Sequence, residues 1–469
     1  MTSDPLPIAA AVTELYAADK KIYPRAVSGW FAAWRWALVW ATQLVFYGGP
    51  WLMWNDRQAV LFDIVHRKFF IFGMVFWPQD VIYLSVLLII AALSLFLFTA
   101  VAGRLWCGYA CPQTVYTEIF LWIERVIEGD RFQRMKLDRG DLSRRKLGLK
   151  AAKHAAWIAL ALWTGFTFVG YVTPIRGLWS EVMTLSTGPW ETFWMLFYGF
   201  ATYGNAGWMR EQVCIYMCPY ARFQSAMFDK DTLIITYDPE RGEPRGARAK
   251  SADRKARGLG DCVDCSICVQ VCPTGIDIRE GLQYQCIGCA ACVDGCDQVM
   301  DKMGYPRGLI RYATQNALEQ KLSRADIVRR SLRPRVLIYT GILWTIIIAA
   351  AVGLWLRVPL KVDVIRDRSV LAREVVGGDV ENVYQLMIIN TAERARVFDI
   401  EAMGLPTIHL DGETHVTVPA ADSRLVPMRV RVHVEPGSVG PGQHKIQFLV
   451  HAHDDPSVFR REPSIFIVR

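Results

Sequence analysis

The chain has 469 residues, a formal net charge of +8 and a mean hydropathy of +0.18, although 21% of its residues are charged. Apolar and charged residues must therefore lie in separate blocks, which excludes a single soluble domain of ordinary composition. Because lysine and arginine are concentrated in the loops between apolar segments, the basic balance requires no nucleic-acid partner.

Five apolar segments predict a polytopic α-helical membrane protein. Each contains roughly 19 or more mostly apolar residues, the length at which a helix crosses the hydrocarbon core of a bilayer. Tryptophan lies near most of the segment ends, where its amphipathic ring suits the lipid headgroup region. The segments are residues 34–54, 81–101, 155–172, 190–208 and 336–356.

The distribution of lysine and arginine predicts the orientation of these segments. Residues 102–153 contain 11 of them and residues 209–335 contain 20, whereas the loops 55–80 and 173–189 contain 3 and 1. The positive-inside rule therefore places the N-terminus and both basic stretches in the cytoplasm and exports the segment after residue 356. We expect no cleavable signal peptide, since a polar stretch precedes the first apolar segment.

A Cys-x-x-x-Cys-Pro motif follows both the second and the fourth apolar segment, as Cys107, Cys111 and Pro112 and as Cys214, Cys218 and Pro219. Proline favours the first turn of a helix, so we expect each pair at a helix N-terminus, where the helix dipole lowers the thiol pKa. Four such thiols on one membrane face could bind Cu(I) or a further cluster, or could cycle as dithiols. They could also be small buried residues between packed helices.

The strongest motif is a doubled Cys-x-x-Cys-x-x-Cys-x-x-x-Cys run between residues 262 and 296. Three thiolates at this spacing hold three corners of a [4Fe-4S] cluster, and the fourth cysteine of each run crosses to the other cluster. The spacing predicts one cluster on Cys262, Cys265, Cys268 and Cys296, and a second on Cys272, Cys286, Cys289 and Cys292. Two zinc sites would also use eight thiolates, but a zinc ribbon gives no reason for this doubled spacing.

All twelve cysteines lie in segments predicted to be at or inside the cytoplasmic face, which favours metal ligation over disulfides. The C-terminal segment contains none. It has about seven short alternating runs in roughly 110 residues, which predict an immunoglobulin-like β-sandwich. There His451 and His453 would project from one strand face and could bind copper or zinc, although a solvated strand is the more ordinary interpretation.

These features divide the chain into six predicted parts. They are a cytoplasmic N-terminal segment (1–33), a membrane domain with four spans and both Cys-x-x-x-Cys-Pro turns (34–236), a basic linker (237–260), a ferredoxin-type two-cluster domain with a basic helix (261–335), a fifth transmembrane helix (336–356) and an exported immunoglobulin-like domain (357–469). Two clusters in series imply an electron relay at a membrane.

In their order along the chain, these features resemble the FixG/CcoG family of cbb-type cytochrome c oxidase accessory proteins, which are polyferredoxin-like membrane proteins. The first exported loop, with Ala59-Val-Leu-Phe-Asp-Ile and Arg67-Lys-Phe-Phe-Ile-Phe-Gly-Met-Val-Phe-Trp-Pro-Gln-Asp80, is similar to the family's as well. The resemblance covers nearly the whole chain. Asp297 is a departure from the ferredoxin pattern, because proline commonly follows the last cysteine.

The resemblance implies a multi-pass protein of the bacterial inner membrane that reduces Cu(II) to Cu(I) for the copper-containing subunit of the oxidase. On that basis Cys107, Cys111, Cys214 and Cys218 would handle copper, in an oxidoreductase with an unidentified electron donor. Its partners would be membrane lipid and oxidase subunits or copper chaperones, and the sequence also admits a homo-oligomer.

Two other functions stay open on the sequence. One is an electron-transfer subunit that links quinol or ferredoxin to an exported reductase. The other is an oxidase-assembly scaffold whose clusters are structural and whose sandwich domain docks on a partner through an edge strand.

Overall fold

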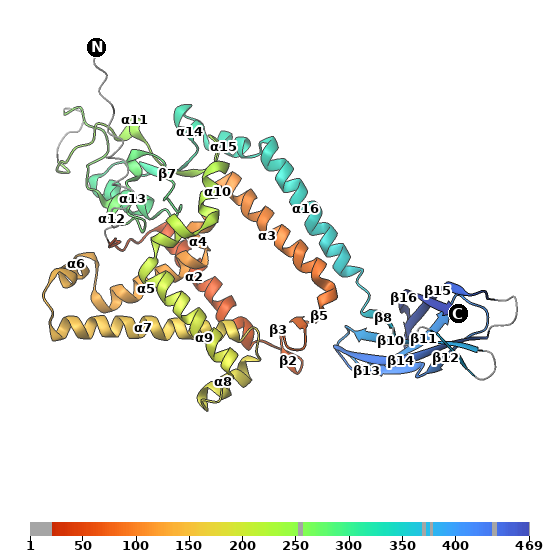
Figure 1. Cartoon of the computed structure of the whole chain (residues 1–469). Helices are drawn as coiled ribbons and strands as arrows, with labels where there is room; N and C mark the ends of the chain where they lie inside the picture. The colour runs from red at the N-terminus through yellow and green to blue at the C-terminus, as the bar shows by residue number, and fades with distance from the viewer. Residues whose placement is uncertain (1–20, 252–256, 368–371, 376–378, 434–438, 469) are drawn as a thin grey trace, which may run out of the picture. The chain divides into compact units, whose positions relative to one another are not determined.

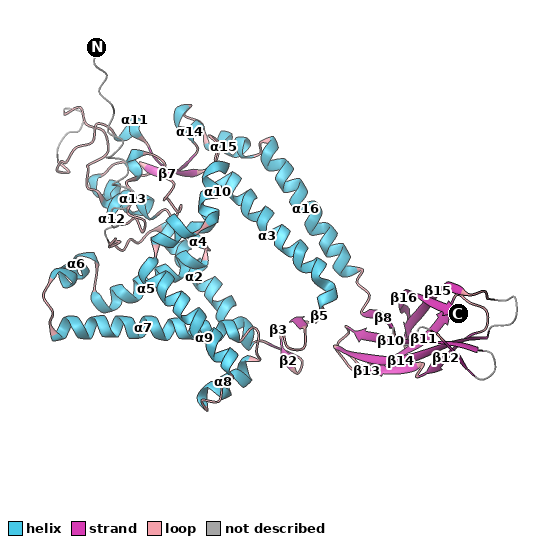
Figure 2. Cartoon of the chain, viewed as in Figure 1, coloured by secondary structure: helices cyan, strands magenta, loops and turns pink. Residues whose placement is uncertain are grey.

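The computed structural model describes residues 21–251, 257–367, 372–375, 379–433 and 439–468. The first 20 residues of the predicted cytoplasmic segment therefore lie outside the described residues. The chain forms two compact units, of which the first contains the chain up to Gly48, Ile90–Val169 and Thr184–Leu343, and the second contains Gly49–Ile89, Gly170–Met183 and the chain from Trp344. Helices dominate the first unit, and most strands belong to the C-terminal part of the second (Figure 2).

The first unit is built on helices α2 (Trp30–Gly48), α5 (Pro112–Glu128), α7 (Arg144–Val169) and α9 (Pro189–Thr202). Trp157 of α7 is 2% exposed and stacks on Phe120 of α5, with ring centroids 5.2 Å apart. Its indole nitrogen donates a hydrogen bond to Phe120 O at 3.1 Å. This aromatic pair fixes α7 against α5, the helix that follows the first cysteine pair.

Two helical segments, Pro78–Ala102 and Pro334–Trp355, are long and apolar enough to cross a membrane. They correspond to α3 (Val81–Ala102) with the short turn before it, and to α16 (Pro334–Trp355). The two lie side by side (Figure 1). Near one end the Tyr83 hydroxyl donates to Gly353 O at 3.2 Å, and near the other Arg333 Nη2 donates to Ala100 O at 2.6 Å.

The other three predicted spans form helices, but five transmembrane helices are not confirmed. Among the described residues only the two segments above have the length and composition of a membrane span. Helix α9 has 14 residues and continues as a π-helix, η4 (Tyr203–Met209), while the first half of α7 is basic. Helix α2 places Arg35 and Gln43 among its apolar residues.

The cysteine-rich block is anchored by a strand pair that the sequence pattern did not reveal. Strand β6 (Ile234–Tyr237) pairs antiparallel with β7 (Ile310–Ala313), on either side of the cysteine runs. Between them lie the short helix α12 (Ile267–Gln270) and the longer α13 (Ala291–Met303). Strands of four residues are too short to show a hydrophobic period, so their pairing depends on the tertiary structure.

The predicted basic helix before the fifth apolar segment is wrong, because the chain forms two short helices there. These are α14 (Gln315–Glu319) and α15 (Arg324–Ser331). Lys321 has a left-handed φ of 53°, which breaks the helix, and the Ser323 side chain accepts a hydrogen bond from Asp326 N and starts the next one.

The C-terminal domain is a β-sandwich, as predicted, with nine strands among its described residues. They are β8 (Leu360–Arg366), β9 (Arg373–Val375), β10 (Asp379–Asn390), β11 (Arg396–Met403), β12 (Ile408–Gly412), β13 (His415–Val418), β14 (Asp422–His433), β15 (Gly442–Ala452) and β16 (Asp455–Val468). One sheet has the order β12-β14-β10-β8, with β9 also paired to β10, and the other has the order β13-β11-β15-β16. Side chains of both sheets, including the fully buried Tyr384 and Phe448, form one core.

The loop before α3 belongs to the same unit as the sandwich. Its strands are β3 (Val60–Asp63), β4 (Lys68–Ile71) and β5 (Met74–Phe76). Phe70 and Val75 of this small sheet form an apolar cluster with Ile389 of the sandwich. The buried carboxylate of Asp80 pairs with Arg357 at 2.8 Å and Lys361 at 2.5 Å, which ties the start of α3 to the entrance of the sandwich.

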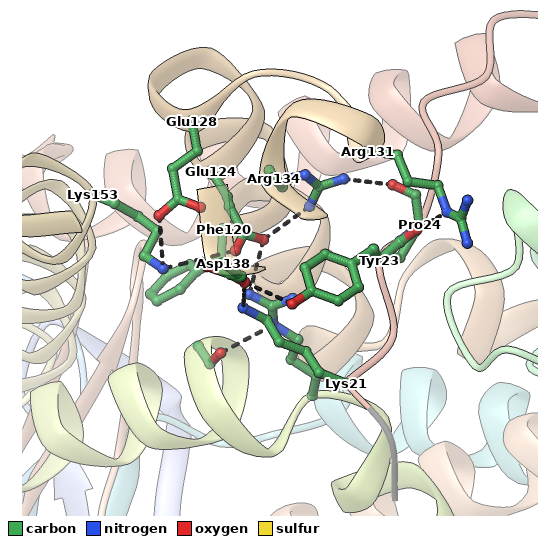
Figure 3. A network of polar contacts seen from close by, with 12 residues as sticks. Lys21, Tyr23, Pro24, Phe120, Glu124, Glu128, Arg131, Arg134, Asp138 and Lys153 are labelled. Carbon is green, nitrogen blue, oxygen red and sulfur yellow. Dashed lines mark hydrogen bonds and ion pairs between the residues drawn. The ribbon is translucent and has the colours of Figure 1, made fainter. Parts of the chain in front are cut away.

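In the first unit, a buried ion-pair network joins the two segments that carry the Cys-x-x-x-Cys-Pro motifs (Figure 3). Glu124 of α5 has no exposed surface, and its Oε2 lies 3.0 Å from both Arg134 Nη1 and Arg210 Nη2. Lys153 of α7 pairs with the neighbouring Glu128 at 3.0 Å. Burial by itself raises the pKa of Glu124, but Arg210, Arg134 and Lys153 outweigh it, and the pKa is lowered.

The same network fastens the N-terminal strap, residues 21–24, to the helices. Arg134 of α6 (Arg131–Arg139) donates to Pro24 O at 2.6 Å. Asp138 accepts hydrogen bonds from Lys21 at 2.8 Å and from the Tyr23 hydroxyl at 2.6 Å. The strap, α5, α6 and the chain at Arg210 are therefore held by one set of charges.

We expect Glu124→Gln to loosen this network, because two buried guanidinium groups lose their counter-charge. Removing one partner of a buried ion pair costs about 3–5 kcal/mol. Hydrogen exchange of the α5 amides should show local opening that is easier by that amount. Glu319→Gln is the control, since Glu319 is exposed and accepts a hydrogen bond from Gln315 of its own helix. Protection equal to that of the control would contradict the assignment.

Phe448→Ala should destabilise the sandwich by about 3–5 kcal/mol, because a fully buried aromatic side chain leaves a cavity. Pulse proteolysis of the full-length protein across a urea series measures this loss. Phe459 lies in the adjacent strand with 44% of its surface exposed, so Phe459→Ala should shift the midpoint much less. Equal shifts for the two variants would refute a shared core centred on Phe448.

Candidate functional site

The structure gathers the eight cysteines of the doubled run around two cavities. One cavity is lined by Cys262, Cys265, Cys268 and Cys296. The other is lined by Cys272, Cys286, Cys289 and Cys292, together with Cys268. These are the two sets of four cysteines that the sequence spacing predicts. In each set three thiols come from one cysteine run and the fourth comes from the other run. The donor sets therefore fit two [4Fe-4S] clusters.

The two runs fold with the same backbone conformation. Asp264 and Gly288, each just before the second cysteine of its run, have left-handed φ values of 50° and 70°. Ser266 and Ala290, each just after that cysteine, have φ values of 54° and 57°. Residues with left-handed φ on either side of the second cysteine curve the backbone around a concave site. The two cysteine runs therefore share a backbone conformation as well as a sequence pattern.

An arginine that the motif did not reveal lines the first cavity. Arg279 is held by Asp277 and by Asp264, whose carboxylates each lie 2.6 Å from it. Burial raises the pKa of the nearby Cys268 thiol to about 11, and the positive charge of Arg279 acts in the opposite direction. No spacing rule links this arginine to the cysteines, so only the folded chain identifies it. Asp297 accepts a hydrogen bond from Gly308 N at 2.9 Å, and its charge adds to burial and Cys268 in raising the pKa of the adjacent Cys296 thiol.

The Cys-x-x-x-Cys-Pro motifs form the predicted helix starts. Cys111 is the N-cap of α5 and Cys218 is the N-cap of α10 (Pro219–Met227), each with proline in the first turn. Cys107 lies in the short helix α4 (Leu105–Tyr109), and Cys214 lies in a π-helical turn, η5 (Val213–Met217).

These four cysteines, which we call the thiol group, lie within electrostatic reach of one another. Cys107 interacts with Cys111 and Cys214, and Cys214 interacts with Cys111 and Cys218. The Cys107 thiol also lies 3.6 Å from Gln224 Oε1 of α10, so a residue after the second motif contacts the first. The tandem repeat thus brings its two halves together.

The predicted lowering of the thiol pKa is wrong for three of these cysteines. Burial raises the pKa of Cys107 to about 12 and that of Cys214 to about 11. Burial also raises the pKa of Cys111, although hydrogen bonds from the backbone at Gln113 and Thr114 act in the opposite direction. The cost of desolvating a thiolate exceeds the gain from the helix N-terminus at these positions.

The thiol group adjoins the second cysteine cavity. Cys107 and Cys214 pack against the apolar cluster that contains Cys289, and Cys292 packs there as well. The backbones at Gly108 and Gly288 approach so closely that a Cβ atom on Gly108 would lie 2.7 Å from Gly288 O. Tyr312 of β7 braces the same turn, since its hydroxyl donates to Gly288 O at 2.6 Å.

Within the part of the chain that the structure describes, no three His, Cys, Asp or Glu side chains are arranged to hold a single metal ion. A copper ion at the thiol group therefore stays a prediction. In the sandwich, His453 and His415 hydrogen-bond to Asp399 at 2.9 and 2.6 Å, and His451 Nε2 lies 3.7 Å from Glu401. The copper or zinc interpretation of His451 and His453 gains no support from this arrangement.

Sequence families match three parts of the chain. Residues 209–315 match a 4Fe-4S dicluster domain, and residues 84–150, which include Cys107 and Cys111, match a 4Fe-4S binding domain. Residues 350–469 match the family described as an IG-like fold at the C-terminus of FixG. A crystal structure of a FixG-related protein from Vibrio parahaemolyticus matches 24% of this chain and 97% of its own at 26% identity, with a TM-score of 0.22.

Relatives match almost the whole length. Protein RdxA of Cereibacter sphaeroides is 39% identical over 439 residues, which cover 90% of this chain and 91% of that protein. Protein RdxB of the same organism is 39% identical over 441 residues, covering 92% and 91%. Nitrogen fixation protein FixG of Rhizobium meliloti is 37% identical over 486 residues, covering 96% of this chain and 92% of that protein. The chain is an iron-sulfur redox protein, and it belongs to the FixG family.

Proposed function

We propose that this protein passes electrons through two [4Fe-4S] clusters to the thiol group, where Cu(II) is reduced to Cu(I) during assembly of a cbb-type cytochrome c oxidase. The observation that carries the proposal is the packing of Cys107 and Cys214 against the buried apolar cluster that contains Cys289. A metal ion at the thiol group would be the immediate neighbour of the second cysteine cavity.

The eight cysteines of the two cavities would hold the clusters, and a bound cluster supplies one-electron transfer. Cys268 lines both cavities, so the two sites share a wall and can act in series. Cys262, Cys268 and Cys289 are buried, whereas Cys265 is exposed, so the first cavity has one thiol at the surface. This arrangement suits a relay better than a single catalytic centre.

The thiol group suits copper for a chemical reason. Reduction of Cu(II) takes one electron, and thiolate ligands prefer the soft Cu(I) ion that results. The four side chains are each half-buried, so they are accessible to an ion at the surface of the helices. A second candidate is a further 4Fe-4S cluster on the same four thiols, which the family match of residues 84–150 favours.

The remaining features fit an inner-membrane assembly factor. We propose five transmembrane helices, a cytoplasmic N-terminus with the clusters, and a periplasmic sandwich that contacts oxidase subunits or copper chaperones. The two long apolar segments and the basic loops support this topology. An electron-transfer subunit for an exported reductase, and a scaffold with structural clusters, are the alternatives that the next two experiments separate.

Cys289→Ala should remove the second cluster and leave the first. Anaerobically purified wild-type protein should contain about eight iron atoms per chain and the variant about four, because each cubane holds four. Paramagnetic resonance after dithionite should lose the coupling between two reduced clusters. About twelve iron atoms in the wild type would indicate a further cluster on the thiol group, and zinc in place of iron would refute the proposal.

The double variant Cys214→Ser and Cys218→Ser should abolish Cu(II) reduction by dithionite-reduced protein, because serine cannot stabilise Cu(I). Formation of Cu(I) is measured with a chromogenic Cu(I) chelator. His451→Ala, in the sandwich, is the control and should reduce copper at the wild-type rate. Unchanged reduction by the double variant, with cluster absorbance intact, would defeat the assignment of the thiol group.

A further inference from the structure

Arg104 is a buried cation between the two halves of the thiol group. It lies three residues before Cys107, at the start of α4, and is only 6% exposed. Its guanidinium donates a hydrogen bond to Ala221 O of α10 at 2.5 Å. Ala221 is three residues after Cys218, so Arg104 joins the segment of the first Cys-x-x-x-Cys-Pro motif to the segment of the second.

The backbone of Arg104 also contacts the second cysteine run. Gly288 lies between Cys286 and Cys289, and a Cβ atom at Gly288 would lie 3.1 Å from Arg104 O and 3.5 Å from Arg104 Cβ. Both of these cysteines line the second cavity. One residue is therefore in contact with the chain segments that supply both sites of the proposed function.

Among the described residues, no carboxylate forms an ion pair with Arg104. Arg279, the arginine at the first cavity, is instead paired with both Asp277 and Asp264. A buried cation is stable only when negative charge lies near it. For Arg104 the groups able to supply that charge are the sulfur atoms of the thiol group and of the second cavity.

The cysteines of both sites respond to this positive charge. Burial raises the pKa of the Cys107 and Cys286 thiols to about 12, and Arg104 acts in the opposite direction. Burial also raises the pKa of Cys214 to about 11, where Arg104 again opposes the rise and Glu211 adds to it less strongly. One guanidinium therefore favours negative charge at the thiol group and at the second cavity.

We propose that Arg104 is the shared counter-charge of the second cysteine cavity and the thiol group, where it stabilises the negative charge that arrives with an electron. A cluster gains one negative charge on reduction, and a fixed positive charge beside it raises its reduction potential. At the thiol group the same electron converts Cu(II) to Cu(I), which also leaves the site more negative by one charge. The copper part of this inference rests on the proposed function, whereas the effect on potential requires only the clusters.

Arg104→Gln should lower the reduction potential of the second cluster and leave that of the first cluster unchanged. At a fixed solution potential, the ratio of reduced to oxidised second cluster should fall at least about tenfold, which corresponds to about 59 mV for one electron. Paramagnetic resonance of the full-length protein, titrated anaerobically with dithionite, measures this ratio. The Cys289→Ala protein, which should keep only the first cluster, identifies the signal that should not shift.

Two control variants separate charge from shape. Arg104→Lys keeps the positive charge, so its ratio should stay within about threefold of the wild-type value. Lys302→Gln removes a positive charge from the exposed surface of α13, where water and salt screen it, and should leave the ratio unchanged. An equally large fall in Arg104→Lys, an equal shift of both clusters, or no shift in Arg104→Gln would overturn the proposal.

Arg104→Met is a second neutral variant of similar length, and it should show the same fall in the ratio as Arg104→Gln. Iron content shows whether each variant holds both clusters. A purely structural role for Arg104 would lower the iron content without moving the potential of the remaining cluster. Loss of the second cluster from both neutral variants would therefore overturn the proposal.

The affinity of the thiol group for Cu(I), measured by competition with a chromogenic Cu(I) chelator, tests the other half of the shared role. Arg104→Gln should raise the Kd about tenfold, because the copper-thiolate site loses its counter-charge. Lys302→Gln should bind Cu(I) as the wild type does. An unchanged Kd in Arg104→Gln would refute the shared role.

The two measurements distinguish this inference from the proposed function. Absence of Cu(I) binding in the wild type, with the shift in potential of Arg104→Gln intact, would refute copper at the thiol group and leave Arg104 as the counter-charge of the second cluster. Unchanged potentials in Arg104→Gln, with copper reduction that depends on Cys214 and Cys218, would refute the role of Arg104 and leave the proposed function standing.

Discussion

The contact between Gly108 and Gly288 is the constraint on which the rest of the site depends. Gly108 has no Cβ, and any other residue would bring one to 2.7 Å from Gly288 O. Gly288 in turn has a left-handed φ of 70°, which glycine adopts without strain. Only these two backbones without side chains can lie so close, and their contact makes the thiol group a neighbour of the second cysteine cavity.

A second constraint keeps the two halves of the thiol group in register. Arg210 has a φ of 39° and a ψ of −109°, a conformation that is costly for any residue with a side chain, and it lies four residues before Cys214. Its guanidinium pairs with the fully buried Glu124 of α5, thirteen residues after Cys111 of the first motif. Buried charges are stable only when they are paired, so the ion pair between Arg210 and Glu124 stabilises the strained turn at Arg210. It also fixes the second Cys-x-x-x-Cys-Pro motif against the first.

Parts of this architecture could be predicted from local patterns. The spacing of the doubled cysteine run predicts the same two sets of four cysteines that line the two cavities. Pro112 and Pro219 mark the starts of α5 and α10. The alternating runs after residue 362 predicted most strands of the sandwich. The prediction failed where a segment's state depends on distant partners, as in α9, which becomes a π-helix, and in the basic helix that breaks at Lys321.

The sequence by itself determined the family and the sandwich and predicted the iron-sulfur donor sets, because spacing, proline and alternation are properties of neighbouring residues. Only the tertiary structure decided that burial raises the pKa of Cys107 and that Arg279 lines the first cavity. Each of these depends on which side chains from other elements exclude water or supply charge around the group. That information is a property of three-dimensional packing and is absent from any local stretch of the chain.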